Sequence, residues 1–442
     1  MKRTRRSHLF RRGVLLFTQI ILISVFGCGP VATPIIIDLP TSTRPPGEPT
    51  QPPATPFLPT AIPSITPTTF VPIATIKIFS HVPLTGDQAE FGNDILRGTE
   101  LAVEQLSGPL HERQIQVELV SFDDQGDVSV ARSNAQSIVT DSEILCGVGH
   151  YGSDTTLAAS DVYHQGGLPF VAPSTTAPLL TDLNYLEANR VIARADGQGT
   201  VAAQFAQAQQ YASTYIITQQ AQTSLRNAEA FRAQSGGLGI QWLGTVVIDT
   251  TPDSLNTTVS KIASASPAVV YISSTPDRAI PYMLALRAAG YTGAFLGTED
   301  LHNPSLINQA GPSLLDGGGL YYTISSPPPN YHPDTEQFIF DYTDQYGSPP
   351  LSFAARAYDA AGICLKGIDR AFETKGGGLP TRNEVARAIR RLNNYEGLTG
   401  EYDFNREGDP DPVPYYVYQV TTVDLANWDQ NPIIAAYEVP PP

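Results

Sequence analysis

The stretch ILCGVGHYGSDTTLAASDVYHQGGLPFVAPSTTAP, residues 144–178, contains the pattern that decides the fold. The apolar run at 144–148 contains one glycine and is followed by further glycines, a pattern that is typical of a strand buried in a parallel sheet. A helix is expected to begin at Ser153. A second apolar run at 168–171 predicts the next strand, and hydroxyl side chains follow it at 174–176. Both strands would deliver hydroxyls and free N–H groups to one edge of a sheet. Ligands of open α/β sheets bind at that edge, and helix N-termini there favour anions.

Strand and helix patterns alternate on both sides of this stretch and predict an α/β fold. Residues 76–178 read β-α-β-α-β-α-β, which favours a doubly wound parallel sheet, and Asn93 or Asp94 is placed to cap the first helix. The pattern breaks at 194–199 and restarts over 200–324, which indicates a second such sheet. Helices expected at 334–345, 351–373 and 381–392 have no strands between them, so we expect them to cover the first sheet.

This order of elements predicts two doubly wound parallel-sheet lobes joined by about three hinge crossings. The first lobe is expected at 75–196 plus 326–408, and the second at 197–325 plus 409–435. Two lobes joined in this way can close on a ligand by a hinge motion.

The N-terminus is predicted to be a targeting segment. Basic residues and then a short apolar run precede Cys28, which fits a lipoprotein signal peptide over residues 1–27 and lipidation of Cys28, with an uncleaved anchor helix as the alternative. Residues 28–74 are rich in Pro and Thr and are read as an extended tether that could reach on the order of 100 Å at ~3 Å per residue. Either alternative places the folded part outside the cytoplasmic membrane.

Charge limits the partners of the chain. The 442 residues carry a formal net charge of −16, and without the basic segment 1–27 the remaining 21 basic and 43 acidic groups give −22. Such a surface argues against nucleic acid and against an anionic membrane surface as partners. No cofactor is predicted.

Cysteine and acidic residues are interpreted as structural. Cys146 lies in an expected strand and Cys364 in an expected helix; a disulfide would suit an exported protein, but we interpret them as buried free thiols. A cluster of three acids, Asp123, Asp124 and Asp127, is interpreted as a solvated turn. The seven histidines lack the spacing of metal ligands, so no metal site is predicted.

Two enzymatic interpretations are weak. Residues 147–152 match G-x-G-x-x-G, but the next strand ends without the acid that a dinucleotide site requires. Ser153 has no G-x-S-x-G elbow, and His150 precedes it too closely to act as its base. The sequence therefore favours a binding protein over an enzyme.

The quoted stretch, IKIFSHVPLTGDQAEFGNDILRGTELAVEQL at 76–106 and YDAAGICLKGIDRA at 358–371 resemble the leucine/isoleucine/valine-binding protein family. These are type I periplasmic binding proteins of branched-chain amino acid ABC transporters. The resemblance covers roughly residues 75–420 in the same order. It implies two lobes around an amino acid and a membrane permease as the partner.

The resemblance also implies a set of ligand contacts. Ser153 matches a residue that holds the ligand α-carboxylate, Ser174 and Thr176 match contacts to the carboxylate and amino groups, and Glu299 matches an acid that binds the ammonium group. Other places near the ligand are taken by Phe91, Tyr151, Thr223 and Thr275, where Thr223 and Thr275 stand near positions at which the family has tyrosines. The ligand side-chain pocket is therefore expected to differ from the family's.

Together these observations predict an extracytoplasmic, lipid-anchored binding protein for a small zwitterion, such as a branched-chain or other amino acid, that serves an ABC permease. Alternatives are a ligand-sensing lipoprotein of the same fold that acts on a signalling partner, and a binding protein for an amide, urea or other small organic ligand.

Overall fold

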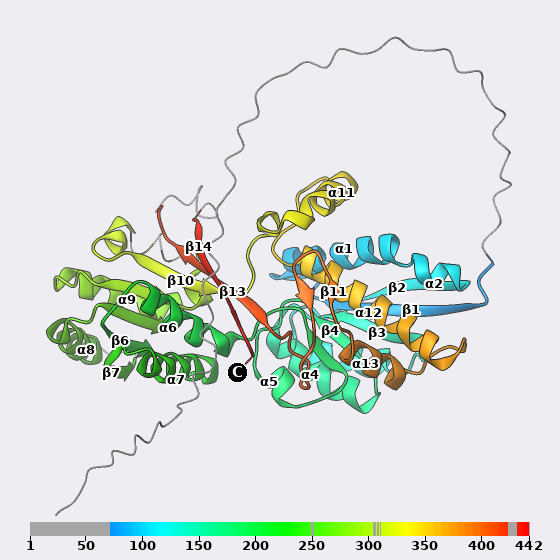
Figure 1. Ribbon diagram of the computed structural model, residues 1–442, viewed down its shortest axis with the longest axis horizontal. Coiled ribbons are helices and arrows are strands. Elements are labelled where there is room, and N and C mark those ends of the chain that lie inside the picture. The colour runs from blue at the N-terminus through cyan, green and yellow to red at the C-terminus, as the bar shows by residue number, and fades with distance from the viewer. Residues whose placement is uncertain are drawn as a thin grey trace, which may run out of the picture. The chain divides into compact units, whose positions relative to one another are not determined.

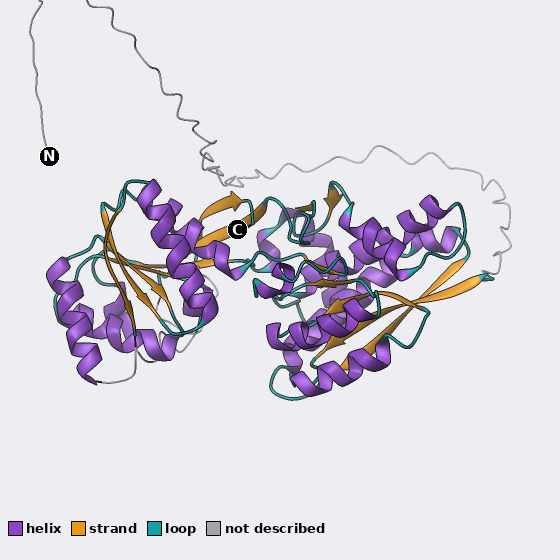
Figure 2. Ribbon diagram, turned by 90° about the horizontal axis from the view of Figure 1, so that it is seen from below, coloured by secondary structure: helices purple, strands orange, loops and turns teal. Residues whose placement is uncertain are grey.

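Two β-sheets, each covered by helices, form the core of the chain (Figures 1 and 2). The computed structural model describes residues 71–248, 252–303, 306, 309, 311–422 and 431–441. The expected signal peptide, Cys28 and most of the tether lie outside the described residues, as does most of the helix expected at 303–310.

The first sheet has the order β2-β1-β3-β4-β5 and is entirely parallel. Its strands are β1 (Ala74–Val82), β2 (Ile115–Asp123), β3 (Ile144–Gly149), β4 (Phe170–Ala172) and β5 (Ala188–Arg190). Side chains alternate between its faces, so Ile76 and Ile78 enter one core and Phe79 enters the other. Because both faces are buried, the strands need nearly continuous apolar runs.

Helices cover both faces of the first sheet. One core contains residues of α1 (Ala89–Leu106), α12 (Ala354–Lys375) and α13 (Arg382–Arg390), and the other contains residues of α3 (Val128–Ile138), α4 (Ser153–Gln165) and α5 (Leu179–Asp182). Two further helices, α2 (Gly108–Glu112) and α11 (Glu336–Tyr346), and a short hairpin of β11 (Tyr395–Glu396) and β12 (Glu401–Tyr402) belong to the same part of the chain.

The second sheet has the order β14-β13-β10-β9-β8-β6-β7. Strands β6 (Ser213–Thr218), β7 (Gln241–Val247), β8 (Val269–Ser273), β9 (Ala294–Gly297) and β10 (Leu320–Ile324) are parallel, whereas β13 (Val413–Gln419) and β14 (Ile433–Val439) add two antiparallel strands. One face packs on α6 (Gln198–Ala208) and α7 (Gln222–Gly237), and the other on α8 (Pro252–Ala265) and α9 (Pro276–Ala288). Among the described helices, none has both the length and the apolarity needed to cross a membrane.

The predicted fold class is confirmed, with two corrections in detail. Two mostly parallel sheets with helices on both faces form, as predicted, and the chain passes between them in three crossings: residues 191–197, 325–335 and 403–412. Neither the terminal strand β14 nor the short β11–β12 hairpin was predicted. The exact limits of the two lobes remain a prediction.

Asp94 caps a different helix from the one expected. The helix α1 already begins at Ala89, so Asp94 lies inside it and the capping prediction is wrong. Its buried carboxylate instead accepts the backbone N–H groups of Phe353 (3.1 Å) and Ala354 (2.8 Å), where α12 begins. It also accepts hydrogen bonds from Leu351 N–H and the Tyr342 hydroxyl. Asp94 thus satisfies donors at the start of a helix about 260 residues later in the chain.

The two buried cysteines form a disulfide. Cys146 of β3 and Cys364 of α12 have Cα atoms 5.8 Å apart and are joined by an S–S bond across a sequence separation of 218 residues, so the interpretation as free thiols is wrong. The bond ties the first sheet to a helix that follows the five parallel strands of the second sheet in the chain. It therefore crosslinks two distant parts of one core.

Removal of this crosslink should lower the stability of the protein. A disulfide that closes so long a loop typically contributes about 2–5 kcal/mol to the free energy of unfolding. The double variant Cys146→Ala/Cys364→Ala should lose an amount in this range in urea unfolding, and a reductant should lower the stability of the wild type but leave that of the variant unchanged. An equal response of both proteins to the reductant would contradict the pairing.

Candidate functional site

The start of α4 presents unpaired donors at the carboxyl edge of the first sheet. Gly152 is the N-cap residue, in an extended conformation, and no side chain caps the helix. The N–H groups of the first turn, beginning with Ser153, have no acceptor within the helix. Within the described residues, the hydroxyls of Ser153 and Thr176, both half-buried, make no hydrogen bond. This edge is therefore suited to an anionic group such as a carboxylate.

Ser174 holds the loop that leads into α4. Its hydroxyl lies 2.9 Å from the carbonyl oxygens of both His150 and Tyr151, to which it donates. Because that single hydrogen is engaged with the loop, Ser174 can offer a ligand only an acceptor. The next residue, Thr175, is buried and its hydroxyl pairs with that of Thr156 at 2.6 Å. The sequence did not reveal that Ser174 has this structural role.

Three aromatic rings lie beside the same loop. Phe91 stacks on Tyr151 with ring centroids 5.1 Å apart, and Phe353 meets both rings edge-on at 6.4 and 5.6 Å. All three side chains are only partly buried. The structure therefore brings the predicted contacts Phe91 and Tyr151 together and adds Phe353, which the sequence could not place because it stands about 260 residues after Phe91.

Glu299 lies at the carboxyl edge of the second sheet, two residues after the end of β9. Its carboxylate accepts hydrogen bonds from the Ser325 hydroxyl (2.7 Å) and N–H (3.3 Å), and its own N–H donates to Gln198 (2.9 Å). Burial raises the pKa of the Glu299 carboxyl above its ordinary value, the bonds from Ser325 oppose this, and the adjacent Asp300 raises it further. An acid in so unfavourable an environment is typical of a functional site.

Gln219 organises the rest of this edge. Its side-chain carbonyl accepts hydrogen bonds from the Thr275 hydroxyl (3.2 Å) and N–H (3.4 Å) and from Ser274 (3.2 Å), while its amide donates to Ser224 (3.3 Å). These contacts join the first turns of α7 and α9. Of the two predicted contacts here, Thr275 is engaged with Gln219, and Thr223 is half-buried in the first turn of α7. Gln219 was missed by the sequence analysis.

Buried ion pairs fix the crossings. Arg190, at the end of β5, lies 2.8 Å from Asp409 of the third crossing, and both side chains are almost fully buried. Arg194 of the first crossing forms a two-bond pair with Asp196 at 2.9 and 2.8 Å. From α12, Arg356 donates to Val191 O in the first crossing and to Ser326 in the second. Three crossings are therefore held by arginines.

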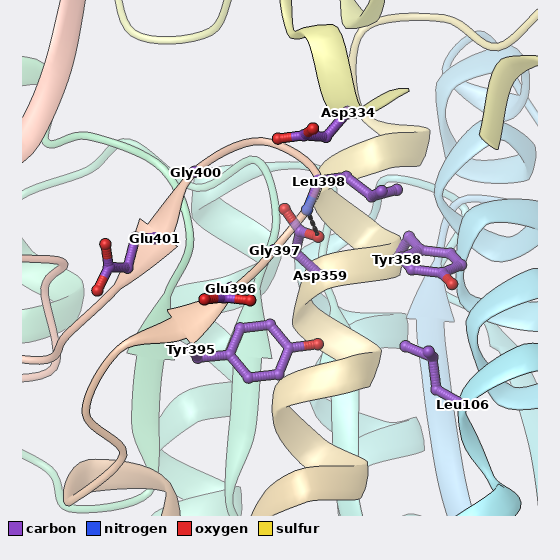
Figure 3. Close-up of a pocket in the computed structure, with 10 residues that line it drawn as sticks. All are labelled: Leu106, Asp334, Tyr358, Asp359, Tyr395, Glu396, Gly397, Leu398, Gly400 and Glu401. Carbon is purple, nitrogen blue, oxygen red and sulfur yellow. Dashed lines mark hydrogen bonds between the residues drawn. The ribbon is translucent and has the colours of Figure 1, made fainter. Parts of the chain in front are cut away.

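A surface pocket of about 550 Å³ lies beside the β11–β12 hairpin (Figure 3). Asp359 of α12 accepts the N–H groups of Leu398 (2.6 Å) and Thr399 (2.9 Å), and burial raises its pKa to about 6. The carboxylate thus holds the hairpin in place. None of the predicted ligand contacts lines this pocket, so we assign it no part in ligand binding.

The structure corrects the interpretation of the acidic turn. Asp123 accepts hydrogen bonds from Leu84 and Gln125, and Asp127 caps α3, as surface-turn residues do. Asp124, however, is fully buried and lies 2.6 Å from the ring of His150. With His81 these two residues form a three-membered group of possible metal ligands, which the spacing of the histidines in the sequence did not indicate.

Comparison with known proteins identifies the family. The periplasmic binding protein family matches residues 75–424, and the chain belongs to this family. It is 27% identical over 348 residues to the leucine-, isoleucine-, valine-, threonine- and alanine-binding protein of Pseudomonas aeruginosa, and 26% identical over 348 residues to the Leu/Ile/Val-binding protein homolog 2 of Brucella abortus; each match covers 78% of this chain and 90% of the relative.

A solved structure shows the same fold. The leucine-binding protein of Thermotoga maritima superposes with a TM-score of 0.62 at 24% identity, covering 82% of this chain and 98% of that protein. The resemblance noted in the sequence is therefore confirmed at the level of family and fold.

The raised pKa of Glu299 predicts how this residue affects stability. An acid with a higher pKa in the folded than in the unfolded protein favours folding when protonated, and this contribution is lost as the pH rises through the folded pKa. Relative to the wild type without ligand, Glu299→Gln should therefore become more stable between about pH 4 and pH 7, since it stays neutral. Thermal unfolding across this range measures the difference.

The matched control is Glu401→Gln, which changes an exposed glutamate of the β12 strand. If both variants gain similar stability over the wild type as the pH rises, or if Glu299→Gln gains none, then the surroundings of Glu299 do not specifically disfavour its charged form.

Proposed function

We propose that the protein is an extracytoplasmic solute-binding protein that captures a small zwitterion, such as a branched-chain or other amino acid, and delivers it to an ABC permease. The observation that carries the proposal is the opposite chemistry of two sheet edges. The first sheet offers unpaired N–H groups and hydroxyls at α4, and the second offers the desolvated carboxylate of Glu299. The carboxylate and ammonium groups of an amino acid complement these two edges.

Each predicted contact has a role in this proposal. Ser153, Thr176 and the first turn of α4 donate to the ligand carboxylate. Ser174, whose hydrogen is engaged, accepts from the ammonium group, which Glu299 also binds. The names of the relatives, which refer to leucine, isoleucine, valine, threonine and alanine, support this ligand class.

The ligand side chain is proposed to lie against the aromatic rings of Phe91, Tyr151 and Phe353. The half-buried hydroxyls of Thr223 and Thr275 are the proposed contacts from the second sheet. An apolar group that binds against these partly exposed rings removes apolar surface from water, which stabilises the complex by about 25 cal/mol per Å². An aliphatic side chain is suited to this surface.

Thermal unfolding with a panel of amino acids, short amides, urea, sugars and aromatic acids tests the ligand class. A ligand at about 100 times its dissociation constant adds about 2.7 kcal/mol to the free energy of unfolding, which raises the melting temperature by a few degrees. We expect this shift with aliphatic amino acids. The shift should disappear in Glu299→Gln, because a buried ammonium group would lose its counter-charge.

The matched control for this experiment is Asp300→Asn, which changes the adjacent acid and should retain the shift. If the shift is lost in Asp300→Asn but kept in Glu299→Gln, the ammonium contact is Asp300 and the proposed assignment to Glu299 is wrong. A shift with urea, an amide or an aromatic acid that survives Glu299→Gln would contradict a zwitterionic ligand. No shift with any compound would contradict an aliphatic amino acid as the ligand and would leave a ligand outside the panel or the sensing alternative.

The lipid anchor is proposed from the sequence around Cys28. A basic segment, a short apolar run and a cysteine at the expected cleavage position support export and lipidation, and the Pro/Thr-rich tether that follows would separate the anchor from the folded part. In a bacterial host, Cys28→Ser should move the protein from the membrane fraction to the soluble extracytoplasmic fraction. Retention of the variant in the membrane would support the uncleaved anchor helix instead.

A further inference from the structure

A buried polar cluster lies at the carboxyl edge of the first sheet, beneath the loop that begins α4. His81 stands near the end of β1, Asp124 directly follows β2, and His150 directly follows β3, so three neighbouring strands contribute to it (Figure 1). All three side chains are 0% exposed, and so is Tyr163 of α4. Burial without water requires that the polar atoms satisfy one another.

Close contacts link these side chains into a row. The Tyr163 hydroxyl lies 2.8 Å from Nδ1 of His81 and 3.4 Å from Nε2 of His150. Nδ1 of His150 lies 2.6 Å from the carboxylate of Asp124. At the other end, the amide nitrogen of Asn134 lies 3.3 Å from Nε2 of His81. Every ring nitrogen of the two histidines therefore has a partner.

The direction of each hydrogen bond follows from one end of the row. The amide nitrogen of Asn134 also donates to the carbonyl oxygen of Asp123 at 2.8 Å, and a carbonyl can only accept, so the NH₂ group faces this way. Nε2 of His81 must then accept from Asn134, and its Nδ1 must carry the hydrogen.

The remaining bonds are then fixed in turn. His81 Nδ1–H donates to the Tyr163 oxygen, the Tyr163 hydroxyl donates to His150 Nε2, and His150 Nδ1–H donates to Asp124. Burial lowers the pKa of His81 well below its ordinary value, and burial and Asp124 raise the pKa of Tyr163 well above its own. Both shifts agree with a neutral ring and a protonated phenol.

The same atoms could be considered as a metal site, because two histidines and an aspartate are zinc ligands and their donor atoms lie within 4.8 Å of one another. Zinc requires a free lone pair on one nitrogen of each ring. In this row one nitrogen of each ring carries a hydrogen and the other accepts a hydrogen bond. The complete hydrogen bonding therefore favours protons over a metal ion.

The row ends in the loop proposed to bind the ligand. The ring of His150 is held by Asp124 and Tyr163, and its carbonyl is held by Ser174, so its position is fixed from two sides. Ser153 and the first turn of α4 follow within three residues. The carboxylate of Asp124 is itself held by the N–H of Gly126 at 2.9 Å.

We infer that Asn134, His81, Tyr163, His150 and Asp124 form a one-directional hydrogen-bond chain with both imidazoles neutral and protonated at Nδ1, and that this chain positions the 149–153 loop and the N-terminus of α4. These are positioning residues, because they act on the ligand through the loop. The hydrogen-bond chain and its effect on the loop do not depend on the proposed function; only the identity of the ligand that the loop binds rests on it.

Nitrogen NMR of the full chain with ¹⁵N-labelled histidine tests the chain directly. The rings of His81 and His150, assigned by their proximity to Tyr163, should both be neutral with the hydrogen on Nδ1 at pH 7, and one equivalent of Zn²⁺ should leave them unchanged. A hydrogen on Nε2 of either ring, a charged ring, or a zinc-dependent shift of both rings would overturn the chain, the last in favour of a metal site.

Amide hydrogen exchange tests the positioning role without any ligand. Tyr163→Phe removes one hydroxyl and keeps the ring, so the exchange of amides in 150–156, including Thr156 N–H bonded to Gly152 O, should become about tenfold faster. The matched control is Tyr185→Phe, which removes a hydroxyl bonded to Asp161 on the same helix. Equal exchange in the two variants would overturn the positioning role.

If a zwitterion binds the wild type, its affinity should fall about three- to tenfold in Tyr163→Phe and stay unchanged in Tyr185→Phe. An unchanged affinity in Tyr163→Phe would also overturn the positioning role. If the wild type binds no zwitterion, the proposed function fails, and the NMR and exchange measurements still decide the inference on their own.

Discussion

Charge pairing at the crossings is the constraint on which the rest of the structure depends. Arg190 and Asp409 are buried together at 2.8 Å, and loss of either partner would leave an unpaired charge in the interior at a cost of about 3–5 kcal/mol. Arg356 places a second guanidinium against the first and second crossings. Because each arginine bonds to segments that are far apart in sequence, the crossings are fixed as a group. Each sheet and its helices can therefore be made of segments that are not consecutive in sequence, because the segments that link them are held in place.

The proposed binding edges gain their chemistry from incomplete local bonding. The first turn of α4 has no side-chain cap, although Ser153 and Asp154 stand there, and Glu299 is kept in surroundings that disfavour its charge. Elsewhere, buried carboxylates hold distant parts of the fold together: Asp94 receives four hydrogen bonds, and Asp359 holds a hairpin. Asp94 and Asp359 thus stabilise the fold through their hydrogen bonds, whereas Glu299 is the proposed contact for a ligand.

The sequence predicted the fold because the fold depends on local periodicity. Apolar runs and helical spacing identify most strands and helices, and the order of elements is enough to give two doubly wound sheets. The position of Ser174 just after a strand also predicts that it lies at the sheet edge where α4 begins, and its hydroxyl indeed contacts the loop that leads into α4. What the sequence could not give are pairings over long separations: Cys146 with Cys364, Asp94 with the start of α12, and Phe91 with Phe353.

His81, Asp124 and His150 illustrate the same limit. Their spacing matches no metal or catalytic motif, and an aspartate in a turn is normally solvated. Only the sheet order β2-β1-β3 brings the three strand ends side by side. The burial of Asp124 thus follows from the order of the strands in the sheet, and the residues next to Asp124 in sequence do not reveal that order.

The bond between Cys146 and Cys364 makes a covalent ring of the chain between them, and this ring includes the five parallel strands of the second sheet, β6 to β10. The ring cannot close until residue 364 has been synthesised, so the parallel strands of the second sheet are all made before the first core is locked. After closure, a single proteolytic cut anywhere between residues 147 and 363 opens the ring but does not release a fragment. A nicked molecule would remain one covalent unit until it met a reductant.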